Sequence, residues 1–127
     1  MKLLKIIVFF IPLLASTGLV IAQNAPVYHK STEVNQVVLA ALTYTSVAGV
    51  CRQRDAYFDL KSALVHLLER ENSSRNLTRE GAVLYSNLET YIAAGEKGYE
   101  NNPYVTCGDA IKYIEMILDL VNSNLRK

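Results

Sequence analysis

The stretch that decides the fold is TCGDAIKYIEMILDLVNSNL, residues 106–125. Its apolar side chains recur three and four positions apart, which is the spacing of one helix face. The stripe consists of Ile111, Ile114, Ile117, Leu118, Val121 and Leu125. Thr106 stands at the expected N-cap, and Asp109 three residues later gives a weaker version of the capping box. The pattern predicts an amphipathic helix that begins after Thr106 and buries one face.

Two earlier segments show the same spacing. The first helix is predicted over residues 32–52, with Thr32 as its N-cap and a stripe from Val34 to Thr45. Its Val and Thr content leaves a strand over residues 37–50 open as an alternative. The second helix is predicted over residues 55–71, and Asp55 is its candidate cap. Its stripe consists of Tyr57, Leu60, Leu64, Leu67 and Leu68.

The boundary between these two helices is not marked in the sequence. After Gly49 no Gly or Pro separates them, so they either run together or bend between Cys51 and Asp55. A third helix is predicted over residues 79–95, capped by Thr78 and ended by Gly95 and Gly98. Its stripe consists of Leu84, Leu88, Tyr91 and Ile92, with Tyr85 at the margin.

Four helices with short connections predict an all-α fold, a small antiparallel bundle. Residues 32–127 then form a single helical domain, and residues 23–31 form a flexible lead-in. Both cysteines belong to this bundle, Cys51 near the end of the first helix and Cys107 at the start of the last. We expect a disulfide between them that links these two helices. An intermolecular bridge and a reactive thiol are the alternatives.

The N-terminus has the layout of a secretory signal peptide. Lys2 and Lys5 form a positive n-region, an uncharged apolar run covers residues 6–19, and Val20-Ile21-Ala22 precedes Gln23. We therefore expect residues 1–22 to be cleaved, and the mature protein to be secreted or periplasmic without a stable membrane anchor. An uncleaved anchor is the alternative, but the apolar run is short for a spanning helix. Export also favours the disulfide.

Charge and composition argue against several function classes. The full chain has 13 basic and 12 acidic residues, and loss of Lys2 and Lys5 leaves 11 against 12, a net charge near −1. The mature chain therefore lacks the basic excess of a nucleic-acid-binding protein. Its two histidines, His29 and His66, are too few and too far apart to predict a metal site. We predict no cofactor and no enzymatic activity.

The densest polar cluster of the chain follows the first cysteine. Arg52, Arg54, Asp55, Tyr57 and Asp59 form the candidate binding surface there. Asp55 and Asp59 stand four residues apart and share one helix face, so a small hydrolase that uses these carboxylates is the less favoured alternative. Exposed on a helix near two arginines, they are ordinary solvated charges.

A second candidate surface surrounds the Asn-Asn-Pro loop before Cys107, where Tyr99 and Tyr104 flank residues 101–103. Two aromatic side chains on a disulfide-anchored loop are typical of a recognition surface. The alternative is that both tyrosines pack beneath the loop.

The layout resembles small helical periplasmic proteins with a single disulfide. Some of these are immunity proteins that block cell-wall-degrading toxins from neighbouring bacteria. The resemblance rests on size, export, helices and the placement of Cys51 and Cys107. Export, the missing catalytic constellation and the eight tyrosines, all in the mature part, lead us to expect a protein that binds another envelope or secreted protein, as an inhibitor, immunity factor or assembly accessory. A carrier of a small ligand is the alternative.

Overall fold

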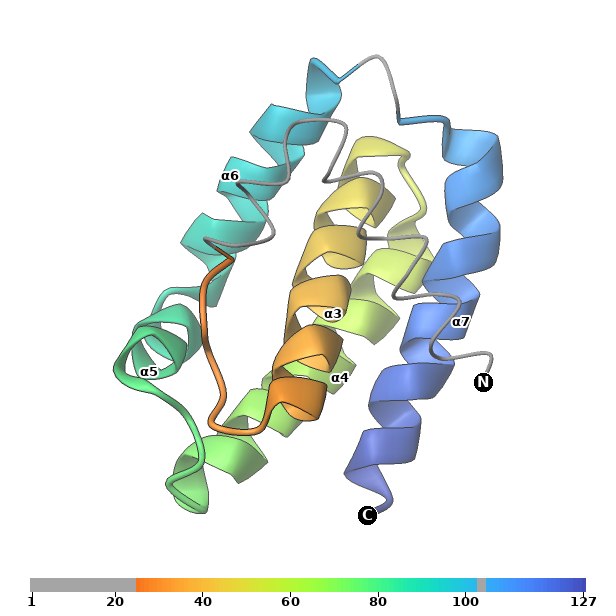
Figure 1. Cartoon of the computed structure of the whole chain (residues 1–127). Helices are drawn as coiled ribbons and strands as arrows, with labels where there is room; N and C mark the ends of the chain where they lie inside the picture. Colours follow the sequence, from red (N-terminus) through yellow and green to blue (C-terminus); the bar gives the residue numbers. More distant parts are fainter. Residues whose placement is uncertain (1–24, 103–104) are drawn as a thin grey trace.

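The computed structural model describes residues 25–102 and 105–127, which contain five α-helices. They are α3 (Thr32–Val50), α4 (Arg54–Ser73), α5 (Arg79–Ser86), α6 (Leu88–Glu100) and α7 (Cys107–Leu125) (Figure 1). The predicted all-α bundle is confirmed, with its third helix divided into α5 and α6. The predicted signal peptide, residues 1–22, lies outside the described residues.

α3 is the centre of the bundle. It contacts α4, α6 and α7, and Figure 1 shows it between α6 and α7 with α4 behind. Its buried residues surround the helix axis: Asn35, Val37, Val38, Ala40, Ala41, Tyr44, Thr45, Ser46, Val47 and Ala48. Small side chains on several sides of α3 let neighbouring helices approach closely. This burial explains the high Val and Thr content, which had left a strand open as an alternative. The strand alternative is wrong.

The boundary between α3 and α4 lies at Arg52. α3 ends in a Schellman motif, in which the Gln53 N–H donates to the Ala48 carbonyl at 2.9 Å. Arg52 adopts the left-handed conformation there, with a φ of 56°. The chain thus turns without a glycine, and α4 begins at Arg54. Asp55 is not its cap, because Gln53 occupies that position and Asp55 stands in the first turn.

The helix predicted over residues 79–95 is interrupted at Asn87. Thr78 caps α5 as predicted, because its hydroxyl accepts from the Gly81 N–H at 3.1 Å. Gly95 and Gly98 do not end the helix, since α6 continues through both to Glu100. The interruption lets α5 pack against α4 while α6 packs against α3. No glycine or proline marks it in the sequence.

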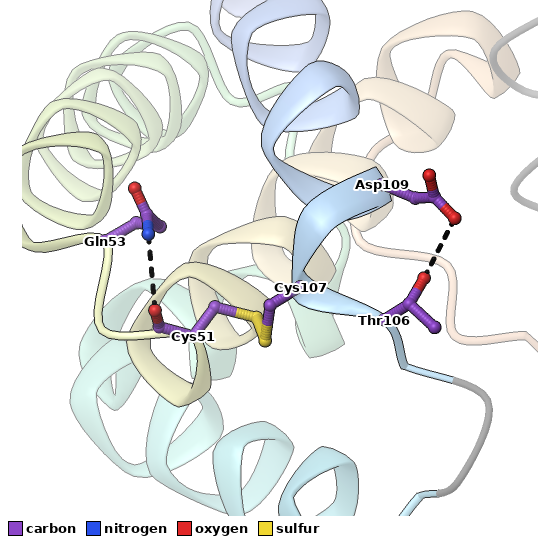
Figure 2. Close-up of a disulfide and its surroundings, with 5 residues drawn as sticks. All are labelled: Cys51, Gln53, Thr106, Cys107 and Asp109. Atoms are coloured by element: carbon purple, nitrogen blue, oxygen red, sulfur yellow. Dashed lines mark hydrogen bonds between the residues drawn. A yellow bond between two sulfur atoms is a disulfide. The ribbon is translucent and has the colours of Figure 1, made fainter.

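α7 buries a stripe that is rotated from the predicted one. Its buried residues are Ala110, Ile114, Ile117, Leu120, Val121 and Asn124. Ile111, predicted to be buried, is 39% exposed, and Leu120 was missed. At its N-terminus the Thr106 hydroxyl donates to the Asp109 carboxylate at 3.0 Å (Figure 2). Ser31, and not the predicted Thr32, is the N-cap of α3.

The disulfide is confirmed between Cys51 and Cys107, with 5.5 Å between the two Cα atoms. Figure 2 shows how it joins the end of α3 to the start of α7. At the opposite end of the bundle, the segment before α3 packs against the loop between α4 and α5. There the Thr78 N–H donates to the Tyr28 carbonyl at 3.0 Å. Tyr28 and His29 are buried, although both lie in the lead-in predicted to be flexible.

Candidate functional site

The structure gathers five of the seven predicted surface residues around the start of α4. Arg52, Arg54, Asp55 and Asp59 are exposed, and Tyr57 is half-buried. They do not form one patch, because the helix turns them toward different flanks. Tyr57 lies on the flank that faces α6, where the charges of Glu89 and Glu96 affect its pKa, and Arg54 lies over the Phe58 ring. Asp59 lies on the flank that faces α7, where it lines a groove.

Four side chains near the start of α4 form what we call the α4 aromatic cluster: Arg54, Tyr57, Phe58 and Lys61. The Phe58 and Tyr57 rings meet edge to face, with 5.4 Å between their centroids. The Arg54 guanidinium carbon lies 6.0 Å from the Phe58 centroid. The Lys61 ammonium lies 5.7 Å from the Tyr57 centroid and forms an ion pair with Glu89 of α6. Two cations therefore bracket two aromatic rings.

Phe58 was missed in the sequence, although it is 52% exposed and the most prominent member of the cluster. The helical spacing contains the signal that reveals it. The buried residues of α4 include Leu60, Leu64 and Leu67, and Phe58 falls on the opposite, polar face. Among the described residues, the large apolar side chains with substantial exposure are Val27, Phe58, Val83 and Ile111, and Phe58 is the aromatic one.

The charges of the cluster are fixed at neutral pH. Partial burial raises the pKa of Tyr57; Lys61 opposes this shift, and Glu96 and Glu89 add to it. The hydrogen bond to Glu89 raises the pKa of Lys61, against a smaller effect of burial. Tyr57 therefore stays a neutral phenol, and Lys61 stays an ammonium ion.

Tyr99 does not join this cluster. It lies near the end of α6, half-buried and close to Tyr44 of α3. Burial raises its pKa, and a hydrogen bond with Thr43 opposes that rise. Tyr99 therefore packs against α3. Tyr104, the other tyrosine of the predicted loop surface, lies outside the described residues.

A groove of about 290 Å³ runs between α4 and α7. It is lined by Asp59, Ser62, Ala63 and His66 of α4 and by Leu118, Asn122 and Leu125 of α7. Within the described chain, no hydrogen bond joins Asp59, Ser62 and His66 to one another, so they do not form an activated nucleophile and base. Over residues 25–102 and 105–127, no group of three or more His, Cys, Asp or Glu side chains is placed to hold a metal ion.

The other cluster of titratable groups is buried at the far end of the bundle. His29 Nε2 lies 2.7 Å from a Glu71 carboxylate oxygen, and His29 Nδ1 accepts from the Ser31 N–H at 2.8 Å. Because Nδ1 is an acceptor, the proton of the neutral ring is assigned to Nε2, which donates to Glu71. Arg70 faces the second carboxylate oxygen at 3.5 Å. These atoms satisfy one another and hold the N-terminal segment to α4.

Comparison with known proteins gives no family to which the chain can be assigned: no family model, no curated protein and no solved structure matches it. In the part of the chain that the structure describes, no helix has the length and apolarity that crossing a bilayer requires.

Proposed function

We propose that this protein is an exported binding module that contacts another envelope or secreted protein through the α4 aromatic cluster. The observation that carries the proposal is the exposure of Phe58, 52% of whose surface is open to water. Water contact with an apolar ring is unfavourable, and a partner surface would relieve it. Tyr57 and Arg54 already hold the ring, so little side-chain freedom is lost when a partner covers it.

The residue types of the cluster support a protein partner. Tyr and Arg are enriched among the few interface residues that contribute most of a binding free energy. Arg52, at the adjacent corner, adds an exposed cation in a left-handed backbone conformation that glycine would adopt with less strain.

Export is part of the proposal and rests on the N-terminal sequence, residues 1–22, and on the single disulfide. In that compartment the module acts as an inhibitor, an immunity factor or an assembly accessory. Its mature net charge near −1 gives no electrostatic basis for binding nucleic acid.

Comparative affinity capture tests this function. Wild-type protein with its disulfide intact and a Phe58→Ala variant are incubated with native envelope and medium fractions, and the bound proteins are identified by mass spectrometry. We expect wild type to retain one stoichiometric partner. Removal of a central aromatic contact weakens binding by about 2 kcal/mol or more, so Phe58→Ala should lose that partner.

Ile111→Ala is the matched control, because Ile111 is also an exposed apolar residue but lies on α7. It should capture the partner as wild type does. Equal capture by wild type and Phe58→Ala would place the interface elsewhere. If no protein is retained from either fraction, the binding function itself is contradicted.

A further inference from the structure

The groove between α4 and α7 has a chemistry that the aromatic cluster does not use. Ala63, Leu118 and Leu125 contribute apolar side chains to its lining, beside the polar groups of Asp59, Ser62, His66 and Asn122. Asp59 supplies the one carboxylate among the lining residues. A ligand that matches this groove needs an apolar stem and a cationic end.

From this chemistry we propose that the groove binds a lysine or arginine side chain of the partner protein. Both side chains have an aliphatic stem that can lie along apolar surface while the charged end stays near water. The stem would pack on Leu118 and Leu125, and the guanidinium or ammonium group would reach the Asp59 carboxylate. This inference rests on the proposed binding function and specifies what the partner presents.

The Asp59 carboxylate is available for such a contact. Asp59 is exposed, and no salt bridge in residues 25–102 and 105–127 includes it. Asp55, one turn earlier on the same helix, is also exposed and adds negative charge nearby. Covering the groove with a partner would reduce solvent screening and strengthen the attraction to a cation.

The size of the groove favours a side chain over a larger ligand. A volume of about 290 Å³ lies at the lower limit of the range typical of pockets for drug-sized molecules. An anionic ligand would meet the Asp59 carboxylate, and a wholly apolar ligand would leave the polar groups of Ser62 and Asn122 without hydrogen-bond partners.

The groove also lies on the same helix as the aromatic cluster, on the opposite flank. A partner that straddles the exposed face of α4 would place an aromatic or acidic group against Phe58 and Arg54, and a basic residue in the groove. α4 would then be the main binding element, with the two flanks of opposite charge fixing the orientation of the partner.

NMR titration of the isotope-labelled, disulfide-bonded protein tests the groove without knowledge of the partner. The probe is n-butylguanidinium, and n-butylurea is the uncharged control of the same shape. We expect n-butylguanidinium to shift the backbone amide signals of Ser62, Ala63, Leu118 and Asn122. Asp59→Asn should weaken this binding by about tenfold, because the charge attraction is lost.

Asp119→Asn is the matched control, since Asp119 is an exposed carboxylate of α7 that does not line the groove. It should leave the titration unchanged. Equal shifts with n-butylurea, or none with either probe, would overturn the groove assignment and leave the function of the aromatic cluster standing.

The affinity of each variant for the captured partner shows whether the cation in the groove comes from that partner. Asp59→Asn should weaken partner binding by about tenfold, and Asp119→Asn should leave it unchanged. If Asp59→Asn abolishes probe binding but not partner binding, the occupant is not the partner. Self-association that Asp59→Asn abolishes would assign the groove to a second copy and overturn the proposal.

Discussion

Two arginines occupy positions that helix ends usually give to glycine. Arg52 and Arg75 follow α3 and α4 with φ angles of 56° and 58°. At the end of α4 the Asn76 N–H donates to the Glu71 carbonyl at 2.9 Å, which completes a Schellman motif. A side chain with a Cβ atom is strained in this conformation, by about 1–2 kcal/mol. The chain therefore carries two local strains that a glycine would relieve.

Arg75→Gly should stabilise the protein by about 0.5–1 kcal/mol, since glycine relieves the strain but adds freedom to the unfolded chain. The Arg75 carbonyl, which accepts from the Lys30 ammonium, is retained in the variant. Urea unfolding at neutral pH measures the change. Arg75→Ala keeps the Cβ atom and should show no gain; a midpoint for Arg75→Gly at or below that of wild type would contradict the strain argument.

Ionisation of Tyr44 makes the free energy of unfolding depend on pH in the alkaline range. Burial, and then the neighbouring Tyr113 and Tyr99, raise its pKa from 10.0 to about 12. The unfolded chain therefore ionises first as the pH rises. The stabilising effect is complete below pH 10 and is lost as the pH rises toward 12. Tyr28, Tyr57 and Tyr99 have pKa shifts in the same direction.

Tyr44→Phe should therefore show a smaller loss of stability between pH 9 and pH 11 than wild type, because one ionisable phenol is removed. Urea midpoints at both pH values measure this. The difference at pH 9 reports the packing and hydrogen bonding lost with the hydroxyl, and only the further change at pH 11 reports ionisation. Parallel losses in both proteins would show that Tyr44 does not contribute.

Single residues also show where sequence patterns stop being informative. Helical spacing identified Leu60, Leu64 and Leu67, which are fully buried. The prediction is correct because a continuous apolar stripe leaves one choice for the buried face of the helix. The same rule placed Ile111 in the core of α7, although it is exposed. Whether an apolar residue at the edge of a stripe is buried depends on where the neighbouring helices lie. The sequence of a single helix does not contain that information.

At the level of whole helices, the glycines of α6 show how a local sequence pattern can differ from what the packing of the fold requires. Both Gly95 and Gly98 suggested a helix end, and both lie inside α6. A Cβ atom at Gly95 would lie 2.3 Å from the Ser46 Oγ atom of α3, whereas one at Gly98 would meet nothing within 4 Å. The Ser46 hydroxyl donates to the Ile92 carbonyl at 3.0 Å, which holds the two helices close.

Gly95→Ala and Gly98→Ala should consequently have opposite effects. Gly95→Ala forces α3 and α6 apart and should destabilise the protein by about 1–3 kcal/mol. Gly98→Ala adds helix propensity at an open site and should stabilise it by up to about 1 kcal/mol. The two urea midpoints decide the matter, and a stabilised Gly95→Ala would show that the helix contact tolerates a methyl group.

The division into α5 and α6 and the centrality of α3 share one physical cause. Each depends on which helices contact one another: α5 packs on α4, while α6 packs on α3. The class of fold, the three longest helices and the cap at Thr78 follow from local patterns and were predictable. The break at Asn87 and the burial of α3 on several sides arise from packing, so no motif marks them.

The candidate site divides in the same way. The polar corner from Arg52 to Asp59 was visible as a cluster of charges in the sequence. Its separation into an aromatic cluster and a groove with a carboxylate was not, because it depends on Lys61 reaching Glu89 of α6 and on α7 packing against α4. The packing of Tyr99 against α3 is likewise a tertiary outcome.

Across the whole molecule, covalent and polar links secure the two ends of the bundle differently. The disulfide joins α3 to α7 at one end. At the other, Arg70 of α4 donates to the Asn124 carbonyl near the end of α7 at 2.8 Å, and the N-terminal segment is bound through His29 and Glu71. Since α4 and α7 both contact α3, each link restricts the same three-helix core.

The disulfide restricts the chain at the end of the bundle where α3 meets α7. Cys51 and Cys107 are 56 residues apart, and a crosslink of that span restricts the unfolded chain by about 4 kcal/mol in the chain-entropy account. The double variant Cys51→Ser with Cys107→Ser should lose roughly that much stability, measured by urea unfolding. Reductant should lower wild type to the level of the variant and leave the variant unchanged. A loss well below 1 kcal/mol would mean that the reduced chain is already restrained when unfolded, and the stability of the bundle would then come from the α3 contacts alone.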